Sequence, residues 1–304
     1  MKNITTKQFQ ILTDNQIVWD LLVKNYNENN VAAPFFEYAL TANWLDKRYL
    51  YLNRLWFDRD KAVGFVFYEA PYTNIHFSLS CEYEELADEM IEYAEKFMPG
   101  NNTDKTFIFK PSQKALMEAA EKRGYRQYYV DKDNVIDFGV AELNYPLPMG
   151  FHFVDPDKVD PVKLAICTWK GFNHEDKGPF ENWEAEDPGT PWNPQKSYQG
   201  IVSKIMAPPP HATFEYNVII ANKKDEYVCF SGMWWVPENK LAYMEPLCTI
   251  PEYRYKGLAS AALSKHYHRM KKLGAECMTG GGNEFYKKIG YNRNAPSLQW
   301  KKGE

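Results

Sequence analysis

Two stretches of the chain share one alternation of apolar and polar positions. Residues 53–69 read as two β-rich runs joined by a polar turn, and residues 217–236 repeat that layout. A further strand is expected in each half, over 76–80 and 241–247, and each runs into a Glu-Tyr pair that opens a helix. The repeat predicts two copies of one β-rich α/β unit.

Each copy continues in the same order. A short strand is expected over 107–109 in the first half and over 276–279 in the second, and each is followed by a helix that ends on Gly-Tyr. The two copies join near the proline-containing stretch 144–150. We therefore expect one domain over 1–145 and another over 146–304.

Helical sequence precedes each block of strands. Thr13 or Asp14 is expected to cap the first of these helices, and Asp160 followed by Pro161 is expected to begin the second. Residues 171–198 show no periodicity and mix aromatic residues with Gly, Pro, Asn and acidic residues. Such a long connection is typically a functional loop or disordered, and its aromatic content argues against disorder.

Length and composition agree with two globular domains. The chain has 304 residues, of which 44% are hydrophobic and 25% charged. A net charge of −4 gives no reason to expect nucleic acid as a partner. The chain lacks the apolar runs of a signal peptide or a membrane span, so we expect a cytoplasmic protein without a membrane partner. Five scattered cysteines outside any C-x-x-C spacing favour reduced thiols and no metal site.

The most informative segment joins a strand to a helix. The strand is expected to end near Thr249, and the turn that follows carries Arg254-x-x-Gly257-x-Ala259. A helix start has unpaired N–H groups and a partial positive charge, so it suits a pyrophosphate, and a glycine lets the backbone approach the anion closely. Arg254 and Lys256 would add charge there. The alternative is an ordinary strand-turn-helix junction.

The context of this turn resembles a known family. Residues 249–259 closely resemble motif A of the GNAT superfamily of N-acetyltransferases, and residues 283–291 resemble its motif B. The strict resemblance covers about 217–300, with a weaker copy in the first half. It implies an α/β (α+β) fold of two tandem GNAT-like domains, each a mixed, mostly antiparallel twisted sheet flanked by helices. The first would be degenerate, and the second would bind acetyl-CoA.

The resemblance also implies which residues bind acetyl-CoA. Leu247 and Thr249 would pair with the pantetheine arm as an added strand does, and Arg254 would lie beside the phosphates. Asn283 is the candidate for the family's cofactor-contacting asparagine, although it stands closer to Tyr286 than is usual in the family. The pyrophosphate would be held by the backbone amides of Tyr255, Lys256, Gly257, Leu258 and Ala259.

Acetyl transfer to an amine must remove a proton from an ammonium and return one to the departing thiolate. Tyr286 occupies the family's position for the acid, and its alternative role is a core tyrosine that packs the helix on the sheet. Glu245 is the best candidate for the base, acting directly or through water, and its alternative role is a strand-end carboxylate in an ion pair. A backbone N–H near Leu247 would stabilise the oxyanion.

The first copy lacks these features. Glu84 and Glu85 stand where the second copy has Arg254, and Ala120 stands opposite Tyr286. We expect the first domain to be a catalytically silent scaffold that shapes the acceptor pocket.

Two other functions remain open. Tandem GNAT-like folds include aminoacyl transferases that use aminoacyl-tRNA but lack the pyrophosphate turn, and a non-enzymatic acyl-CoA sensor would keep the turn without needing Tyr286. The expected acceptor is a small-molecule or peptide amine, and the oligomeric state stays open. The following residues of the 171–198 stretch could receive a cationic amine or form a solvated loop: Glu175, Asp176, Glu181, Trp183, Glu184, Glu186, Asp187 and Trp192.

Overall fold

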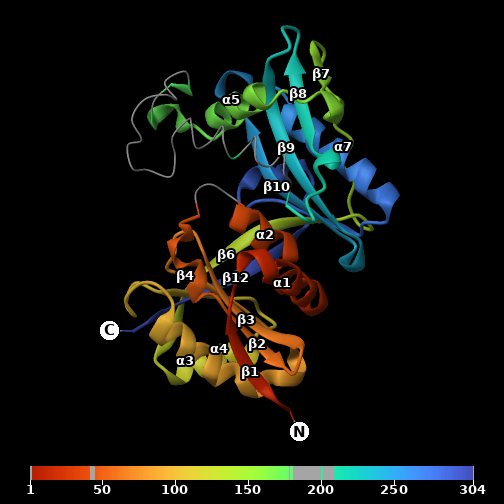
Figure 1. Ribbon diagram of the computed structural model, residues 1–304. Helices are drawn as coiled ribbons and strands as arrows, with labels where there is room; N and C mark the ends of the chain where they lie inside the picture. Colours follow the sequence, from red (N-terminus) through yellow and green to blue (C-terminus); the bar gives the residue numbers. More distant parts are fainter. Residues whose placement is uncertain (1, 42–44, 178, 181–199, 201–208, 304) are drawn as a thin grey trace. The chain divides into compact units, whose positions relative to one another are not determined.

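The computed structural model describes residues 2–41, 45–177, 179–180, 200 and 209–303 (Figure 1). The chain forms two compact units. Unit 1 comprises residues 1–40, 45–133 and 295–304, and unit 2 comprises residues 41–44 and 134–294. Each unit is therefore built from segments that are distant in the sequence.

Unit 1 is a sheet with helices packed on it (Figure 1). Its strands lie in the order β1-β2-β3-β4-β5-β12, in which β4 and β5 run parallel and the other neighbours antiparallel. The elements are β1 (Ile4–Gln8), α1 (Ile11–Asn25), α2 (Ala33–Thr41), β2 (Arg54–Asp58), β3 (Lys61–Glu69), β4 (Asn74–Leu79), α3 (Ala87–Phe97), β5 (Thr106–Phe109), α4 (Lys114–Lys122) and β12 (Arg293–Lys302).

The predicted cap of α1 is wrong. The helix begins at Ile11, before Thr13, and Gln10 is its N-cap residue without a side-chain cap. Asp14 is instead buried inside the first turn, where it accepts from the Gln10 N–H at 2.9 Å and from Lys7 Nζ at 2.6 Å. The Asp14 carboxylate thus binds the N–H at the start of its own helix. It also binds Lys7, which lies in strand β1 before the helix.

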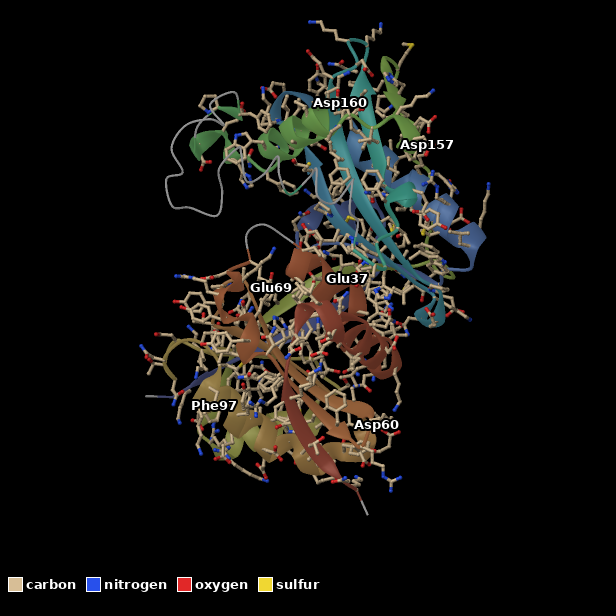
Figure 2. All side chains as sticks on the ribbon, viewed as in Figure 1. Glu37, Asp60, Glu69, Phe97, Asp157 and Asp160 are labelled. Carbon is tan, nitrogen blue, oxygen red and sulfur yellow. The ribbon has the colours of Figure 1, made fainter. Side chains whose placement is uncertain are left out.

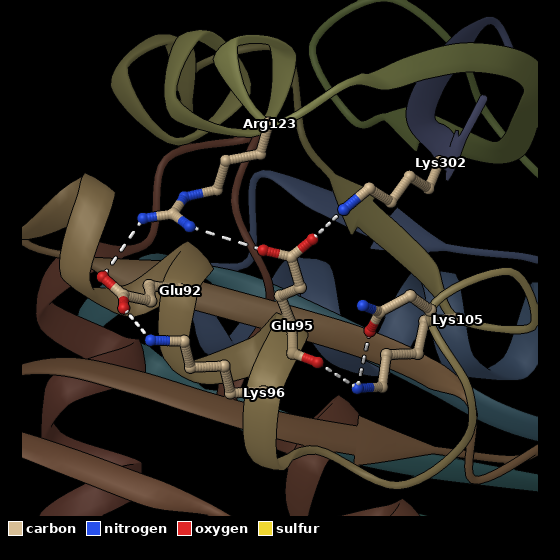
Figure 3. A network of polar contacts seen from close by, with 7 residues as sticks. Glu92, Glu95, Lys96, Lys105, Arg123 and Lys302 are labelled. Carbon is tan, nitrogen blue, oxygen red and sulfur yellow. Dashed lines mark hydrogen bonds and ion pairs between the residues drawn. The ribbon is translucent and has the colours of Figure 1, made fainter. Parts of the chain in front are cut away.

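The last strand of the chain completes unit 1. Leu298, Gln299 and Trp300 of β12 pair with Phe109, Ile108 and Phe107 of β5. Figure 3 shows a polar network at the same place, in which Glu95 of α3 binds Lys302 and lies 3.4 Å from Arg123 Nη1. The backbone pairing and this network together hold the C-terminal segment on unit 1.

Unit 2 repeats the arrangement. Its strands lie in the order β7-β8-β9-β10-β11-β6, again with a single parallel pair, β10 and β11, among the pairings of its described residues. The elements are the part of β6 (Tyr125–Asp137) from residue 134 on, β7 (Phe151–Phe153), α5 (Pro161–Gly171), β8 (Val218–Asn222), β9 (Tyr227–Val236), β10 (Leu241–Thr249), α7 (Leu258–Leu273), β11 (Cys277–Thr279) and α8 (Glu284–Ile289). The predicted fold of two similar α/β units is confirmed.

Helices cover both faces of the unit 2 sheet (Figure 1). On one face, α5 packs its Leu164 and Cys167 against Phe230 and Cys248. On the other, α7 packs Leu258 and Ala262 against Val228 and its neighbours. The strands that carry the candidate site are therefore buried between two helical layers.

The predicted start of α5 is confirmed. Asp160 is the N-cap, and its carboxylate accepts from the N–H groups of Val162 at 2.8 Å and Lys163 at 3.1 Å, with Pro161 at the first helical position. Figure 2 shows Asp160 at this end of the helix. Such a cap satisfies two of the N–H groups that a helix start leaves without partners.

Part of the 171–198 stretch is described. Residues His174–Lys177 form a 3-10 turn, and Phe180 is buried against Ala165 and Trp169 of α5. Glu181, Trp183, Glu184, Glu186, Asp187 and Trp192 lie outside the described residues. The five cysteines are free thiols. The helices that the structure describes include none with the length and apolarity to cross a bilayer.

Candidate functional site

The two parallel strands of unit 2 diverge. Strand β10 pairs with β11 through Leu241 and Ala242, and the Met244 N–H then donates to Thr279 Oγ1 at 2.8 Å. Strand β11 ends at Thr279, whereas β10 continues to Thr249. Beyond Ala242, the described part of the chain places no strand against this edge of β10. An extended ligand can therefore pair with it, as an added strand does.

A β-bulge creates the divergence. Met244 pairs with Met233, but the next paired residue of β10 is Leu247, opposite Ser231, so Glu245 and Pro246 face Gly232 alone. An added Cβ at Gly232 would lie 2.2 Å from the carbonyl oxygen of Glu245. Only glycine fits at this position, opposite the bulge that contains Glu245.

The free edge belongs to the residues predicted to bind the pantetheine arm. The Ile250 N–H donates to the carbonyl of Val228 on β9 at 3.1 Å. Successive residues of a strand direct their backbone groups to opposite edges, so Leu247 and Thr249 direct theirs away from β9. This is the edge that β11 leaves uncovered.

The turn after β10 has the backbone of an anion-binding nest. Tyr255 and Gly257 have φ angles of 60° and 82°, on either side of Lys256. Gly257 is the N-cap of the 16-residue helix α7 and offers no side-chain cap, and the first intrahelical bond runs from the Ala261 N–H to the Gly257 carbonyl at 3.0 Å. The N–H groups of the first helical residues thus point out of the helix start, where an anion is stabilised.

Space is open at this helix start. An added Cβ at Gly257 would find only Pro148 Cγ, at 3.7 Å. The side chain of Tyr255 is fully exposed, and Lys256 Nζ lies 4.6 Å from the ring centre of Tyr253. Backbone donors and the Lys256 ammonium therefore share one exposed surface.

Arg254, which was expected beside phosphates, donates to three acceptors of the protein itself. Its Nε donates to the Thr249 carbonyl at 3.0 Å, and its Nη2 donates to the Gly171 carbonyl at 2.9 Å and to Asn173 Oδ1 at 2.7 Å. The guanidinium donates to these groups because β10 and α5 end there and leave carbonyl groups without other donors from their own elements.

Tyr286 lies in α8 and is buried, with 4% of its surface exposed. Its ring packs against that of Tyr291 at 5.0 Å between centres. An added Cβ at Gly280 would lie 2.6 Å from Tyr286 Cδ1, and one at Gly281 would lie 3.6 Å from the Tyr286 hydroxyl oxygen. The glycine run after β11 thus makes room for the tyrosine that follows it.

Asn283 has a structural role that the resemblance did not imply. Its side-chain oxygen accepts from the Phe285 N–H at 3.0 Å and so caps α8. Its carbonyl accepts from Asn134 Nδ2 at 3.2 Å. Asn283 therefore orients the short helix that carries Tyr286.

Thr279 contacts a neighbour of each candidate catalytic residue. Its hydroxyl holds the Met244 N–H, one residue before Glu245, and its carbonyl accepts from the Tyr291 hydroxyl at 3.5 Å. Burial raises the pKa of Tyr291, so its hydroxyl stays protonated and remains a donor. Thr279 therefore contacts Met244, which precedes Glu245, and Tyr291, whose ring packs on Tyr286.

The equivalent turn of unit 1 is different. A 3-10 helix over Cys81–Leu86 leads directly into α3, and no residue of it has a positive φ. Glu84 and Glu85 are exposed there, and Ala120 is buried within α4. The described residues of unit 1 therefore lack the pair of positive φ angles that unit 2 has at its turn.

Sequence reasoning missed Gly232, Thr279 and Asn173. A glycine inside an apolar strand is a signal of a bulge or a close approach, so Gly232 could have been identified. Thr279 and Asn173 act through contacts with residues distant in the sequence, and no local pattern marks them.

Comparisons with known proteins agree with this geometry. Residues 177–291 match the family model of the acetyltransferase (GNAT) family. A search of curated proteins gives no significant match. Among solved structures, a GCN5-related N-acetyltransferase from Sphaerobacter thermophilus is similar, with 12% identity, a TM-score of 0.55 and coverage of 98% of this chain and 94% of the other.

Two further structures share the fold along nearly the whole chain. A tandem GNAT protein from the clavulanic acid biosynthesis pathway has 10% identity and a TM-score of 0.54, with coverage of 98% of both chains. The C-terminal domain of a putative lysylphosphatidylglycerol synthetase from Agrobacterium fabrum has 12% identity and a TM-score of 0.56, with coverage of 96% of this chain and 92% of the other. At these identities the similarity is one of fold.

Proposed function

We propose, from the match of residues 177–291 to the family model of the acetyltransferase (GNAT) family, that the protein transfers an acetyl group from acetyl-CoA to a primary amine. The observation that carries the proposal is the start of α7. Its Gly257 cap leaves backbone N–H groups pointing into open space, next to the strand edge that β11 does not cover.

The turn supplies the pyrophosphate site. Five successive residues, Tyr255 to Ala259, offer backbone N–H groups, and the helix adds its partial positive charge. Lys256 supplies a further cation from the same turn. A side chain at Gly257 would occupy the space that the phosphates need. It would also destabilise the turn, because residues other than glycine disfavour a positive φ.

The edge of β10 supplies the site for the pantetheine arm. Leu247 directs its N–H and carbonyl to this edge and Thr249 directs its N–H there, while the Thr249 carbonyl accepts from Arg254 Nε. An extended amide chain can pair with these groups as a strand would. The bulge at Glu245 and Pro246 ends the regular pairing just before this edge begins, which leaves backbone N–H groups near Leu247 to stabilise the oxyanion.

The proposed chemistry needs one base and one acid. The Glu245 carboxylate takes the proton of the attacking amine, directly or through a water, and the Tyr286 hydroxyl donates a proton to the departing thiolate. Tyr286 is held for this by Tyr291 and by the glycine run beneath it. Each group has a position fixed by the backbone next to it, which is what proton transfer requires.

Two other functions share the fold. An aminoacyl transferase would take its acyl group from an aminoacyl-tRNA and would not use the turn at Gly257, and a non-enzymatic sensor would bind acyl-CoA without turnover. Solvent-exposed donors at the start of α7 favour a CoA ligand over the first of these.

Calorimetry and a thiol-release assay test the proposal. The full chain should bind acetyl-CoA with one site, in unit 2, and should release free CoA when supplied with an amine from a panel of aminoglycosides, polyamines and peptide N-termini. If acetyl-CoA binds but none of the amines leads to release of CoA, the result would favour the non-enzymatic sensor. No binding of acetyl-CoA would contradict the proposal, and binding that survives a bulky substitution at Gly257 would place the ligand elsewhere.

A further inference from the structure

The guanidinium of Arg254 joins three segments of unit 2. It binds the Thr249 carbonyl at the end of β10, the Gly171 carbonyl at the end of α5, and the side chain of Asn173 just beyond that helix. A guanidinium is a rigid planar group with several donors, so three acceptors bound to it keep a fixed mutual arrangement.

The acceptors are placed for this contact by close packing. An added Cβ at Gly171 would lie 2.7 Å from Cys248 Sγ, so the last turn of α5 lies directly on β10. The carbonyls of Thr168 and Lys170 are already used by the N–H groups of Phe172 and Asn173. The Gly171 carbonyl is a terminal acceptor of the helix, and a cation there also compensates the negative end of the helix dipole.

Asn173 has a backbone that suits its role. Its φ of 59° is left-handed, a conformation that asparagine tolerates better than most residues, and its side chain is turned toward Arg254. Residues 174–177 follow immediately as a 3-10 turn, with the His174 ring 5.1 Å from that of Trp169 and Lys170 Nζ 3.6 Å from Glu175.

The backbone of Arg254 belongs to the phosphate turn. Its N–H donates to the Pro251 carbonyl at 3.2 Å, and Tyr255 with its positive φ comes next. Any adjustment of the turn around an anion therefore moves the guanidinium and the segment bound to it. We propose that Arg254 is a positioning residue that couples acyl-CoA binding at the turn to the order of residues 171–177, where the stretch expected to receive the acceptor begins.

This coupling rests on the proposed function, since it requires CoA to bind at the turn. Binding should stabilise residues 171–177 although the ligand does not touch them, because the ligand fixes the turn and Arg254 transmits the constraint. Such coupling between sites is typically a 5-fold effect or more on an equilibrium.

Amide hydrogen exchange with and without coenzyme A measures the coupling. In the full wild-type chain, saturating CoA should slow exchange over 254–260 and also over 172–177, the latter by about 5-fold or more. Asn173→Gly keeps a residue that adopts a positive φ and removes only the side-chain acceptor, so protection of 172–177 should fall while 254–260 stays protected. Asn173→Asp keeps the acceptor and should restore the protection.

Two variants separate geometry from charge. Arg254→Lys keeps the cation but cannot hold three acceptors, so it should lose protection of 172–177 as Asn173→Gly does. Lys256→Gln removes a cation from the same turn and should weaken CoA binding, yet at saturating CoA it should keep protection of 172–177. Thermal midpoints of all variants show whether each is folded.

The outcomes are distinct. Absence of CoA binding in the wild type overturns both the proposed function and the coupling. Binding that protects 254–260 but leaves 172–177 unchanged overturns the coupling alone, and so does full protection of 172–177 in folded Asn173→Gly.

Discussion

At the scale of single residues, Tyr286 concentrates the proposed chemistry in one hydroxyl group. The ring is fixed by Tyr291 and by the glycines after β11, so its packing and its chemistry can be separated by substitution. The interpretation of Tyr286 as a core residue and the interpretation as an acid both fit its burial. They differ only in what the hydroxyl does.

Tyr286→Phe keeps the ring and removes the hydroxyl. We expect turnover to fall by roughly 10²- to 10⁴-fold, the usual contribution of one general acid, with CoA affinity and the thermal midpoint little changed. Tyr291→Phe is the matched control in the same cluster and should cost stability of about 1 kcal/mol with a much smaller loss of turnover. Wild-type turnover in Tyr286→Phe, measured where chemistry limits the rate, would return Tyr286 to a packing role.

At the scale of elements, helix α7 begins and ends on glycines with positive φ. Gly257 has a φ of 82° and Gly274 a φ of 94°, and an added Cβ at Gly274 would find nothing within 4 Å. The same left-handed backbone therefore occurs at both ends of the helix, and only one end is proposed to hold a ligand.

Gly257→Ala and Gly274→Ala form a matched pair. Each should lose about 1–2 kcal/mol of stability because alanine disfavours a left-handed backbone. Only Gly257→Ala should also weaken CoA binding, and Gly257→Val should abolish it. Isothermal calorimetry on the two alanine variants decides the point, since equal CoA affinities would mean that the phosphates do not lie at this helix start.

The bulge of β10 is the second element on which the site depends. Gly232→Ala would place a methyl group 2.2 Å from the Glu245 carbonyl oxygen, so the bulge must shift. We expect a loss of stability of about 1–3 kcal/mol together with a loss of turnover, because Glu245 and the strand edge move with the bulge. Chemical denaturation measures the first effect. An unchanged stability would show that the two strands are further apart than described.

At the scale of the whole molecule, each unit carries one buried histidine. His76 lies in unit 1 and His266 in unit 2, and burial lowers the pKa of each to about 3, assisted by Lys110 and Arg269 respectively. The unfolded chain binds a proton at each site below about pH 6.5, whereas the folded chain does not. The stability from these groups is therefore present above pH 6.5 and is lost as the pH falls toward 3.

We expect the free energy of unfolding to fall on acidification by on the order of 1 kcal/mol per pH unit for each histidine. Thermal midpoints between pH 7 and pH 4 measure this. His76→Phe removes one titrating group from an aromatic environment, where the ring stacks on Phe67 at 5.3 Å between centres, and should make the decline shallower. A decline as steep as in the wild type would assign the acid sensitivity to other groups.

Local patterns were sufficient to predict most elements and the turn that precedes α7. Alternation over 217–236 predicted β8 and β9, Asp160 with Pro161 marked the start of α5, and the Arg-x-x-Gly-x-Ala spacing predicted the turn before α7. These features depend on neighbours within a few residues, so they can be predicted from the amino-acid sequence. The cap of α1 failed because Asp14 responds to Lys7, which lies outside the helix.

Long-range pairing is what no pattern along the chain could establish. Residues 134–137 belong to unit 2, where β6 pairs with β11, and residues 295–302 belong to unit 1, where β12 pairs with β5. A strand pairs where backbone partners and apolar neighbours are available, and the periodicity of a strand does not indicate which strand that partner is. For the same reason the acceptors of Arg254 and the bulge opposite Gly232 became visible only in the folded chain. The candidate site residues can be named from the sequence, whereas their mutual placement depends on contacts between segments far apart along it.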